Sequence, residues 1–151
     1  QLDYGNGALA AATIKTAYNK MNLSFMKAFT SGIMCNILVC LAVLLAGVCQ
    51  DAIGKIFACF FPIWAFVIAG YEHCVANMYY IPAGLLAKHG EAYYNAAIMA
   101  GMTPDQLDSM TVGKFFLNNL LPVTLGNIVG GVVFVALPLY LIYRNKNKAE
   151  A

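Results

Sequence analysis

An apolar segment from Ile56 to Ala87 constrains the fold of this chain more than any other feature. It contains thirty-two residues and is interrupted near its middle by Glu72 and His73. A helix rises about 1.5 Å per residue and a bilayer core is roughly 30 Å thick, so the segment is too long for one straight crossing and too short for two. We therefore expect one crossing made of two half-helices, with Glu72 and His73 on irregular backbone at the bilayer midplane. Ionisable groups at that depth are candidates for function.

The composition indicates an integral membrane protein. Hydrophobic residues make up 61% of the chain, charged residues 11%, and the mean hydropathy is +0.68, whereas soluble proteins contain about 25% charged residues. No charged side chain occurs from Ala28 to Gln50 or from Phe115 to Tyr143. We expect three crossings, at 28–49, 56–87 (broken) and 115–143. Three crossings can hardly enclose a conduction path, so we expect the chain to be part of a larger protein.

Several classes of function are disfavoured by the sequence. The five cysteines contain no CxxC pair and fall in or beside apolar runs, so they indicate neither a disulfide framework nor a metal site. The net charge of +2, without a block of basic residues, argues against a nucleic-acid partner. We expect no catalytic residues, no cofactor and no metal, and we do not expect an enzyme.

The segments around the crossings carry weaker signals. A helix is expected from about Ala8, and a turn from Gln50 to Lys55 that uses Asp51 and Gly54. Lys88 to Lys114 is polar and is expected to form the main extramembrane loop, with one short helix starting at Thr103.

The third crossing is rich in glycine and asparagine. Gly126 and Gly130 form a GxxxG spacing, which lets helix backbones approach closely. Asn77, Asn119 and Asn127 are predicted to satisfy backbone groups freed by breaks and prolines.

Three strings of the chain form a recognisable set: GIMCNILVCLA at 32–42, GYEHCVANM at 70–78 and NLLPVTLGNIVGG at 119–131. Together they resemble the formate/nitrite transporter family of anion channels. The resemblance extends from about Thr16 to Tyr143 and implies an all-α membrane protein with an aquaporin-like helical bundle. Members have six spans per protomer in two inverted halves. This chain looks like the second, three-span half, with a broken central helix.

The resemblance also implies a topology and an assembly. Charges near the crossings do not decide the orientation, but cytoplasmic termini are implied for the complete protein. Residues 1–27 would then lead into the first span from the extracellular side, and 144–151 would be a cytoplasmic tail. The implied partners are small monovalent anions, the lipid bilayer and the N-terminal half of the same protomer. The implied assembly is a homopentamer with one pore per protomer, as a multi-pass protein of the cell inner (plasma) membrane.

Four residues match pore positions of the family. His73 corresponds to the histidine at the centre of the anion pore. Lys20 corresponds to a vestibule lysine that attracts anions. Phe66 and Val39 match the apolar constrictions on either side of the histidine.

A supporting polar network is expected around Glu72, because a bare buried carboxylate would cost several kcal/mol. We hypothesise that Glu72 pairs with Lys20 and accepts a hydrogen bond from Asn36. Asn77 is expected to belong to the same supporting network.

The resulting prediction is the pore-forming part of a passive channel for small monovalent anions of the hydrosulfide, formate and nitrite class. Hydrosulfide is favoured, because the sequence looks most similar to the bacterial hydrosulfide channel branch and Arg144, in the tail, leaves no bidentate clamp. One alternative is an aquaporin-type neutral-solute pore, although Ala76-Asn77-Met78 stands where Asn-Pro-Ala would be expected. Others are a membrane redox or metal-binding subunit, using His73, Cys74 and the methionines, and a purely structural membrane subunit.

Overall fold

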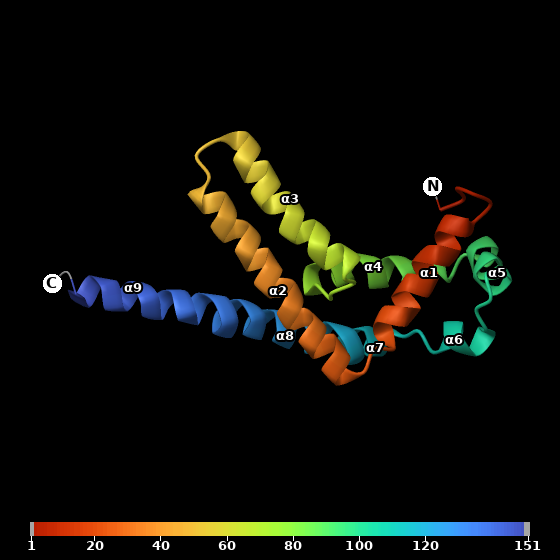
Figure 1. The fold of residues 1–151 in the computed structure, drawn as a ribbon. Coiled ribbons are helices and arrows are strands. Elements are labelled where there is room, and N and C mark those ends of the chain that lie inside the picture. Colours follow the sequence, from red (N-terminus) through yellow and green to blue (C-terminus); the bar gives the residue numbers. More distant parts are fainter. Residues whose placement is uncertain (1, 150–151) are drawn as a thin grey trace. The chain divides into compact units, whose positions relative to one another are not determined.

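The computed structural model describes the backbone of residues 2–149 and the side chains of residues 2–145. All regular elements in this part of the chain are helical, as predicted. In chain order they are α1 (Ala8–Met21), α2 (Phe25–Val48), α3 (Ala52–Ile68), α4 (Cys74–Ala87), α5 (Glu91–Met99), α6 (Pro104–Asp108), α7 (Val112–Lys114), the π-helix η1 (Phe115–Leu120), α8 (Leu121–Gly131), the π-helix η2 (Val132–Ala136) and α9 (Leu137–Ala149) (Figure 1). The expected tail at 144–151 ends outside the described residues.

Among the described residues, two helices are long and apolar enough to cross a bilayer. They are α2 and the continuous helix Val112–Asn145, which contains α7, η1, α8, η2 and the first part of α9. The apolar helices α3 and α4 have 17 and 14 residues, so each is shorter than the roughly 20 residues that a full crossing needs. The predicted all-α membrane fold with a broken central helix is thus confirmed.

The chain forms two compact units, and the first contains Gln1–Lys27 and Cys74–Pro122. Within it α1 packs against α4 and α5 (Figure 1). The crossing of α1 and α4 is close at Gly84, where an added Cβ would lie 3.1 Å from the Thr13 carbonyl oxygen and would collide with the Ala17 side chain. A larger residue at this position would therefore push the two helices apart.

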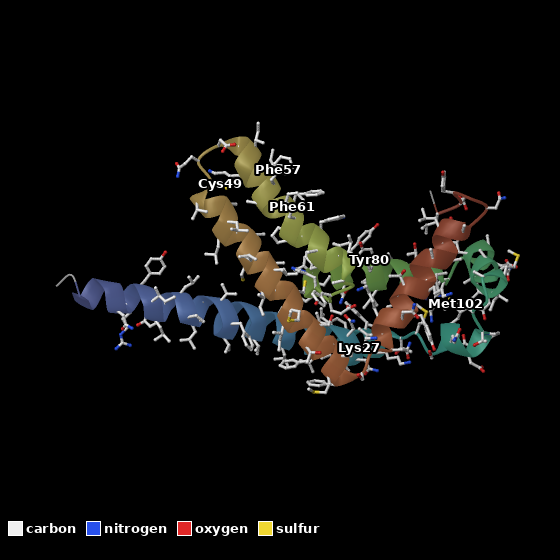
Figure 2. The ribbon with its side chains drawn as sticks, viewed as in Figure 1. Lys27, Cys49, Phe57, Phe61, Tyr80 and Met102 are labelled. Atoms are coloured by element: carbon white, nitrogen blue, oxygen red, sulfur yellow. The ribbon has the colours of Figure 1, made fainter. Side chains whose placement is uncertain are left out.

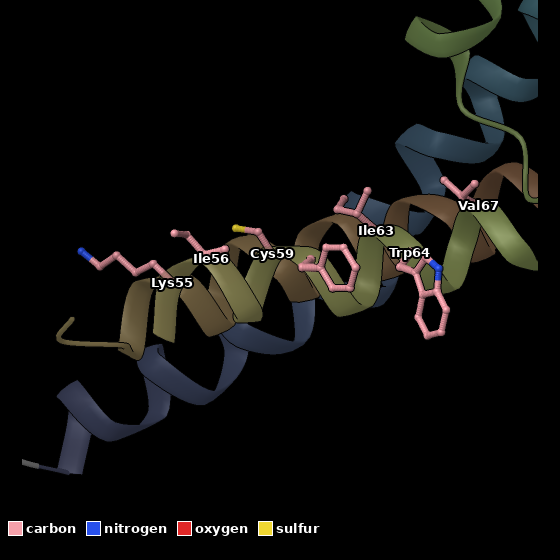
Figure 3. Close-up of a pocket in the computed structure, with 7 residues that line it drawn as sticks. Lys55, Ile56, Cys59, Ile63, Trp64 and Val67 are labelled. Carbon is pink, nitrogen blue, oxygen red and sulfur yellow. The ribbon is translucent and has the colours of Figure 1, made fainter. Parts of the chain in front are cut away.

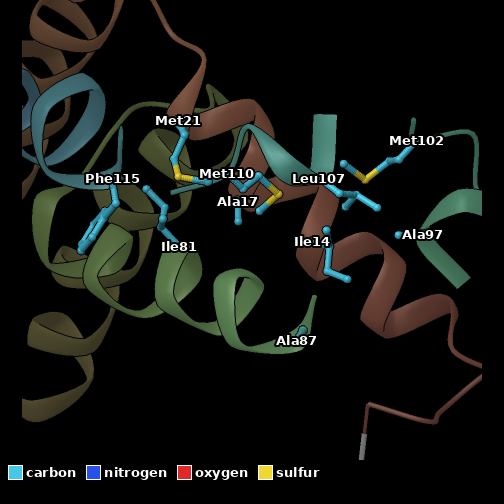
Figure 4. Close-up of a cluster of buried hydrophobic side chains, with 10 residues drawn as sticks. All are labelled: Ile14, Ala17, Met21, Ile81, Ala87, Ala97, Met102, Leu107, Met110 and Phe115. Carbon is cyan, nitrogen blue, oxygen red and sulfur yellow. The ribbon is translucent and has the colours of Figure 1, made fainter. Parts of the chain in front are cut away.

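The core of this unit includes the segment that was predicted to be a loop. Residues from both parts of the unit share one apolar cluster (Figure 4): Ile14, Ala17, Met21, Ile81, Ala87, Ala97, Met102, Leu107, Met110 and Phe115. The prediction of a loop with one short helix is therefore wrong for 88–114, because the segment forms α5 and α6 and buries Met102, Met110 and Leu107 in the core.

Two short helices, α5 and α6, form in this segment, and α7 at its end begins the continuous helix Val112–Asn145. The predicted start at Thr103 is confirmed by a capping box: the Gln106 N–H donates to Thr103 Oγ1 at 3.3 Å, and the Thr103 N–H donates to Gln106 Oε1 at 3.0 Å. Before it, α5 ends at Met99, and Gly101, two residues further on, has a φ of +88°. The Gly101 and Met102 N–H groups donate to the carbonyls of the last turn of α5, at 2.9 and 3.1 Å, an arrangement that glycine favours.

The second unit contains Ala28–His73 and Val123–Ala151. Its helices α2 and α3 are joined by a short turn (Figure 1). The Asp51 carboxylate accepts from the Gly54 N–H at 2.7 Å and so caps the start of α3. Gly54 therefore lies in the first turn of α3, and the prediction that it belongs to the preceding turn is wrong.

The GxxxG spacing in α8 works as predicted. An added Cβ at Gly126 would collide with the Phe29 carbonyl of α2, and one at Gly130 with the Ile33 carbonyl. The two backbones can lie this close only because both positions lack a side chain.

The two π-helices lie directly before prolines. The Leu121 N–H donates to the carbonyl five residues earlier, one residue before Pro122, and the Leu137 N–H does the same before Pro138. A proline in an α-helix lacks its own N–H and clashes with the carbonyl four residues before it. The wider π turn moves that carbonyl away, so the helix continues through both prolines.

Candidate functional site

The broken crossing contains the best candidate site. Helix α3 ends at Ile68 and α4 begins at Cys74, so the predicted break at Glu72 and His73 is confirmed. The break starts at Gly70, which has a φ of +67°. The Gly70 N–H donates to the Val67 carbonyl at 3.1 Å, and the Tyr71 N–H to the Phe66 carbonyl at 3.0 Å. This is a Schellman ending, which glycine adopts without steric cost.

The main chain of the break is fastened to the neighbouring helices at Glu72. Its N–H donates to Ser31 Oγ of α2 at 3.0 Å. Its carbonyl accepts from Asn127 Nδ2 of α8 at 3.1 Å. Non-helical backbone has no ladder partners of its own, so side chains from two helices replace them.

Asn127 is the centre of this network. Its Nδ2 also donates to the Gly32 carbonyl of α2, at 2.8 Å, and its own carbonyl accepts from Asn36 Nδ2 at 2.6 Å. The Asn127 side chain is buried. The prediction that Asn127 satisfies backbone freed by the break is thus confirmed, and Asn36 contributes through Asn127.

Phe66 and His73 lie together in this unit. Their ring centroids are 6.0 Å apart and their planes differ by 27°. Both side chains are half-buried, and His73 is the last residue before α4. An aromatic face therefore borders the imidazole.

The remaining predicted residues of this unit flank the break. Glu72 is only 5% exposed, and burying a carboxylate costs free energy unless it is paired or hydrogen-bonded. Val39 is half-buried on α2, three residues after Asn36.

Lys20 and Asn77 belong to the other unit, where they meet at Asn119. The Asn77 Nδ2 donates to Asn119 Oδ1 at 2.7 Å, and the Asn119 Nδ2 donates to the Lys20 carbonyl at 2.9 Å. Both asparagines are fully buried. Lys20 lies in the last turn of α1, where carbonyls have no helical N–H, so Asn119 satisfies the end of that helix.

The Lys20 side chain lies over an aromatic ring. Its Nζ is 5.8 Å from the centroid of Tyr80 of α4, a residue labelled in Figure 2. Lys20 is half-buried and Tyr80 is 45% exposed. The distance is within the range of a cation–π interaction.

Lys88 and Asp3 make polar contacts with the segment 88–114. Lys88 Nζ donates to the carbonyls of Leu107 and Met110, at 3.0 and 2.7 Å, and so caps the end of α6. A hydrogen bond to Asp3, with burial and the charge of that carboxylate, raises the pKa of Tyr93. These groups stabilise the segment and do not converge on a common ligand position.

An apolar groove of about 750 Å³ lies along α3 alone. It is lined by Lys55, Ile56, Cys59, Phe60, Ile63, Trp64 and Val67 (Figure 3). The same helix exposes Phe57 and Phe61, labelled in Figure 2. Apart from Lys55, the lining offers no charged group to recognise a solute, so this face suits lipid or protein packing better than a solute site.

The sequence analysis predicted no role for three residues at these sites. Gly70 ends α3, Ser31 anchors the break, and Tyr80 contacts Lys20. A glycine directly after an apolar helix is a recognisable stop signal. Nothing in the sequence alone pairs Ser31 with position 72 or Tyr80 with Lys20. In the described residues, no three His, Cys, Asp or Glu side chains gather to form a metal site.

Sequence comparisons identify relatives over most of the chain. The formate/nitrite transporter family model matches residues 2–141. A "Probable formate transporter" of Methanothermobacter thermautotrophicus is 45% identical over 81% of the chain and 37% of its own length. "Uncharacterized transporter YrhG" of Bacillus subtilis is 42% identical (95% and 46%). "Formate channel FocA" of Escherichia coli is 35% identical (94% and 50%).

Solved structures of formate channels and related ion channels also match this chain. A structure described as "Pentameric formate channel with formate bound" superposes with a TM-score of 0.84 at 38% identity, and the match covers 95% of this chain and 56% of that one. An "FNT family ion channel" matches with a TM-score of 0.63 at 30% identity, over 87% and 45%. The chain thus spans about half the length of the proteins it matches. On its sequence, its broken helix and these relatives, the chain belongs to the formate/nitrite transporter family.

Proposed function

We propose that this chain forms part of a passive channel for small monovalent anions, together with the remaining half of the same protomer. The observation that carries the proposal is the broken crossing, with His73 at the end of an anchored, non-helical segment. Family membership supports it, as do relatives named as formate channels. Irregular backbone at membrane depth is typical of substrate and ion sites in transport proteins.

The proposed anion path uses four residues of this chain. Lys20 attracts the anion, and Phe66 strips part of its water. His73 then offers a hydrogen bond, and Val39 borders the exit. The Phe66 ring beside the imidazole supports this arrangement, because an apolar wall next to a single donor favours an ion that has shed water.

Glu72, Asn36 and Asn77 support the path rather than line it. We expect the buried Glu72 carboxylate to pair with Lys20 and to accept from Asn36, since a buried carboxylate needs compensation. Lys20→Met should then destabilise the intact protein as well as reduce anion flux. A Lys20→Met protein with unchanged folding would contradict this pairing.

The proposed assembly is a homopentamer with one pore per protomer, in the cell inner (plasma) membrane. The "Pentameric formate channel with formate bound" supports this arrangement. In the proposed topology the segment 1–27 lies on the extracellular side and the tail 144–151 in the cytoplasm. The crossings are those predicted from the sequence, at 28–49, 56–87 and 115–143.

Formate, nitrite and hydrosulfide are the proposed substrates. The names of the relatives favour formate. The preference for hydrosulfide stays a prediction, which rests on the apolar constrictions and on the lack of an arginine clamp in the spans.

The test is a flux measurement on the intact protein that contains this chain, reconstituted in liposomes. Formate, nitrite, hydrosulfide and chloride are compared under identical gradients, with water and glycerol as neutral solutes. We expect fast weak-acid anion flux and slow chloride flux, and a large loss of anion flux in His73→Asn. His89→Asn is the matched control, because His89 is exposed outside the spans. Rapid glycerol flux without anion flux would replace this proposal with the neutral-solute pore.

A further inference from the structure

The side chains of Lys20, in α1, and Tyr80, in α4, contact each other within the first unit. The Lys20 Nζ lies 5.8 Å from the Tyr80 ring centroid. The face of an aromatic ring carries partial negative charge, so it attracts an ammonium without cancelling its positive charge.

The main chain of Lys20 is fixed as well. Its carbonyl accepts from Asn119 Nδ2 at 2.9 Å, and Asn119 is in turn held by Asn77 at 2.7 Å. Both asparagines are fully buried. The lysine is therefore anchored at its carbonyl by the asparagine pair and at its ammonium by the ring.

We propose that Tyr80 is a positioning residue, which holds the Lys20 ammonium where it attracts the anion. This inference rests on the proposed function, in which Lys20 provides the attracting charge. A lysine side chain is long and flexible, and a held ammonium loses less conformational freedom when an anion binds. The ring acts on the charge of the ammonium, so it can hold that charge in place together with the Glu72 carboxylate that we propose as its partner.

The test replaces Tyr80 in the intact, liposome-reconstituted protein with phenylalanine, and then with phenylalanines of increasing ring fluorination. Fluorine withdraws charge from the ring face and changes its size little, so a packing role would be unaffected. Half-saturating formate concentration and maximal flux are measured for each. We expect Tyr80→Phe to match the original protein, and the fluorinated series to raise the half-saturating concentration step by step, by about two- to fivefold in all, at constant maximal flux.

Two controls make the result specific. The same series at Tyr79, the adjacent ring at 5.6 Å, should be flat. The series at position 80 should also become flat when Lys20 is replaced by Gln. A flat series on the Lys20 background, or one that lowers the half-saturating concentration, would overturn the role of Tyr80 while anion flux upholds the proposed function. A protein without any anion flux would remove both.

Discussion

Asn119 and Asn127 lie eight residues apart on one continuous helix, yet each makes a different set of hydrogen bonds, Asn119 in the first unit and Asn127 in the second. Asn127 donates to main-chain carbonyls of two other elements, one of which is Glu72 in the break. Asn119 donates to a carbonyl in the last turn of α1 and accepts from a second side chain, Asn77. One asparagine stabilises backbone that is not helical, and the other completes the end of a helix.

This difference between Asn127 and Asn119 indicates which of the two side-chain amides contributes more to stability. The end of α1 has further help, since Asn22 supplies its side-chain and main-chain N–H groups to the Tyr18 and Asn19 carbonyls, at 2.7 and 3.2 Å. The break has no helical ladder at Glu72, so the external donors carry more of its stability. We therefore expect substitutions at the break to cost more than those at the end of α1.

The largest effect is expected for Asn127→Leu. The substitution takes a donor from the Glu72 and Gly32 carbonyls, and it should lower the free energy of unfolding by about 2–4 kcal/mol. Anion flux should fall with it, because the break loses one of its two anchors. Thermal unfolding of the intact protein in detergent and liposome flux check both results. Ile128→Leu, at a 53% exposed neighbour, is the control, and equal stability of the two variants would refute the role of Asn127.

A smaller effect is expected for Asn119→Leu, about 1–3 kcal/mol. The Lys20 carbonyl and the Asn77 amide both lose a partner in this variant. Adding Asn77→Leu removes the other partner of the side-chain pair. The loss in free energy of unfolding of the double variant should therefore be smaller than the sum of the two single losses, by at least about 0.5 kcal/mol. Strict additivity in denaturation experiments would show that the two amides do not act as a pair.

Gly70→Ala tests the start of the break without touching either asparagine. Space is open around Gly70, because an added Cβ would meet no atom within 4 Å. The cost should therefore come from the positive φ alone, about 1–2 kcal/mol, and Gly70→Asn should cost less. Gly47→Ala in α2 is the control, since its surroundings are also open but it is helical. A loss of stability at Gly47 as large as that at Gly70 would argue against the backbone explanation.

The smallest effect is expected for Ser31→Ala, about 1 kcal/mol or less. It removes the acceptor of the Glu72 N–H and leaves Asn127 in place. Hydrogen exchange of the Glu72 amide should become faster in Ser31→Ala and stay slow in Ser31→Thr, which keeps the hydroxyl. Unchanged exchange in Ser31→Ala would show that the Ser31 hydroxyl does not protect this amide.

Much of the fold could be predicted because its signals are local. The long apolar run with charges at its middle predicted the broken helix, and the GxxxG spacing predicted the close packing of α8 on α2. The start at Ala8 and the cap at Thr103 follow from short-range chemistry of the same kind.

The errors have two causes, one in distant contacts and one in local geometry. The segment 88–114 looked like a loop because it is polar on average, but its buried methionines join a core whose other members are far away in the sequence. Gly54 looked like a turn residue because the Asp51 cap that places it inside α3 depends on geometry. The contacts of Ser31 and Tyr80 also join distant parts of the chain, and a single sequence does not reveal which residues meet.

The hydrogen bonds that fasten the break at Glu72 run to its main-chain N–H and carbonyl. Every amino acid except proline has both groups. These two anchors therefore do not depend on which side chain stands at position 73. Position 73 could therefore be redesigned: a new residue in place of His73 would change the chemistry presented there, while the hydrogen bonds to the main chain of residue 72 would still hold the loop.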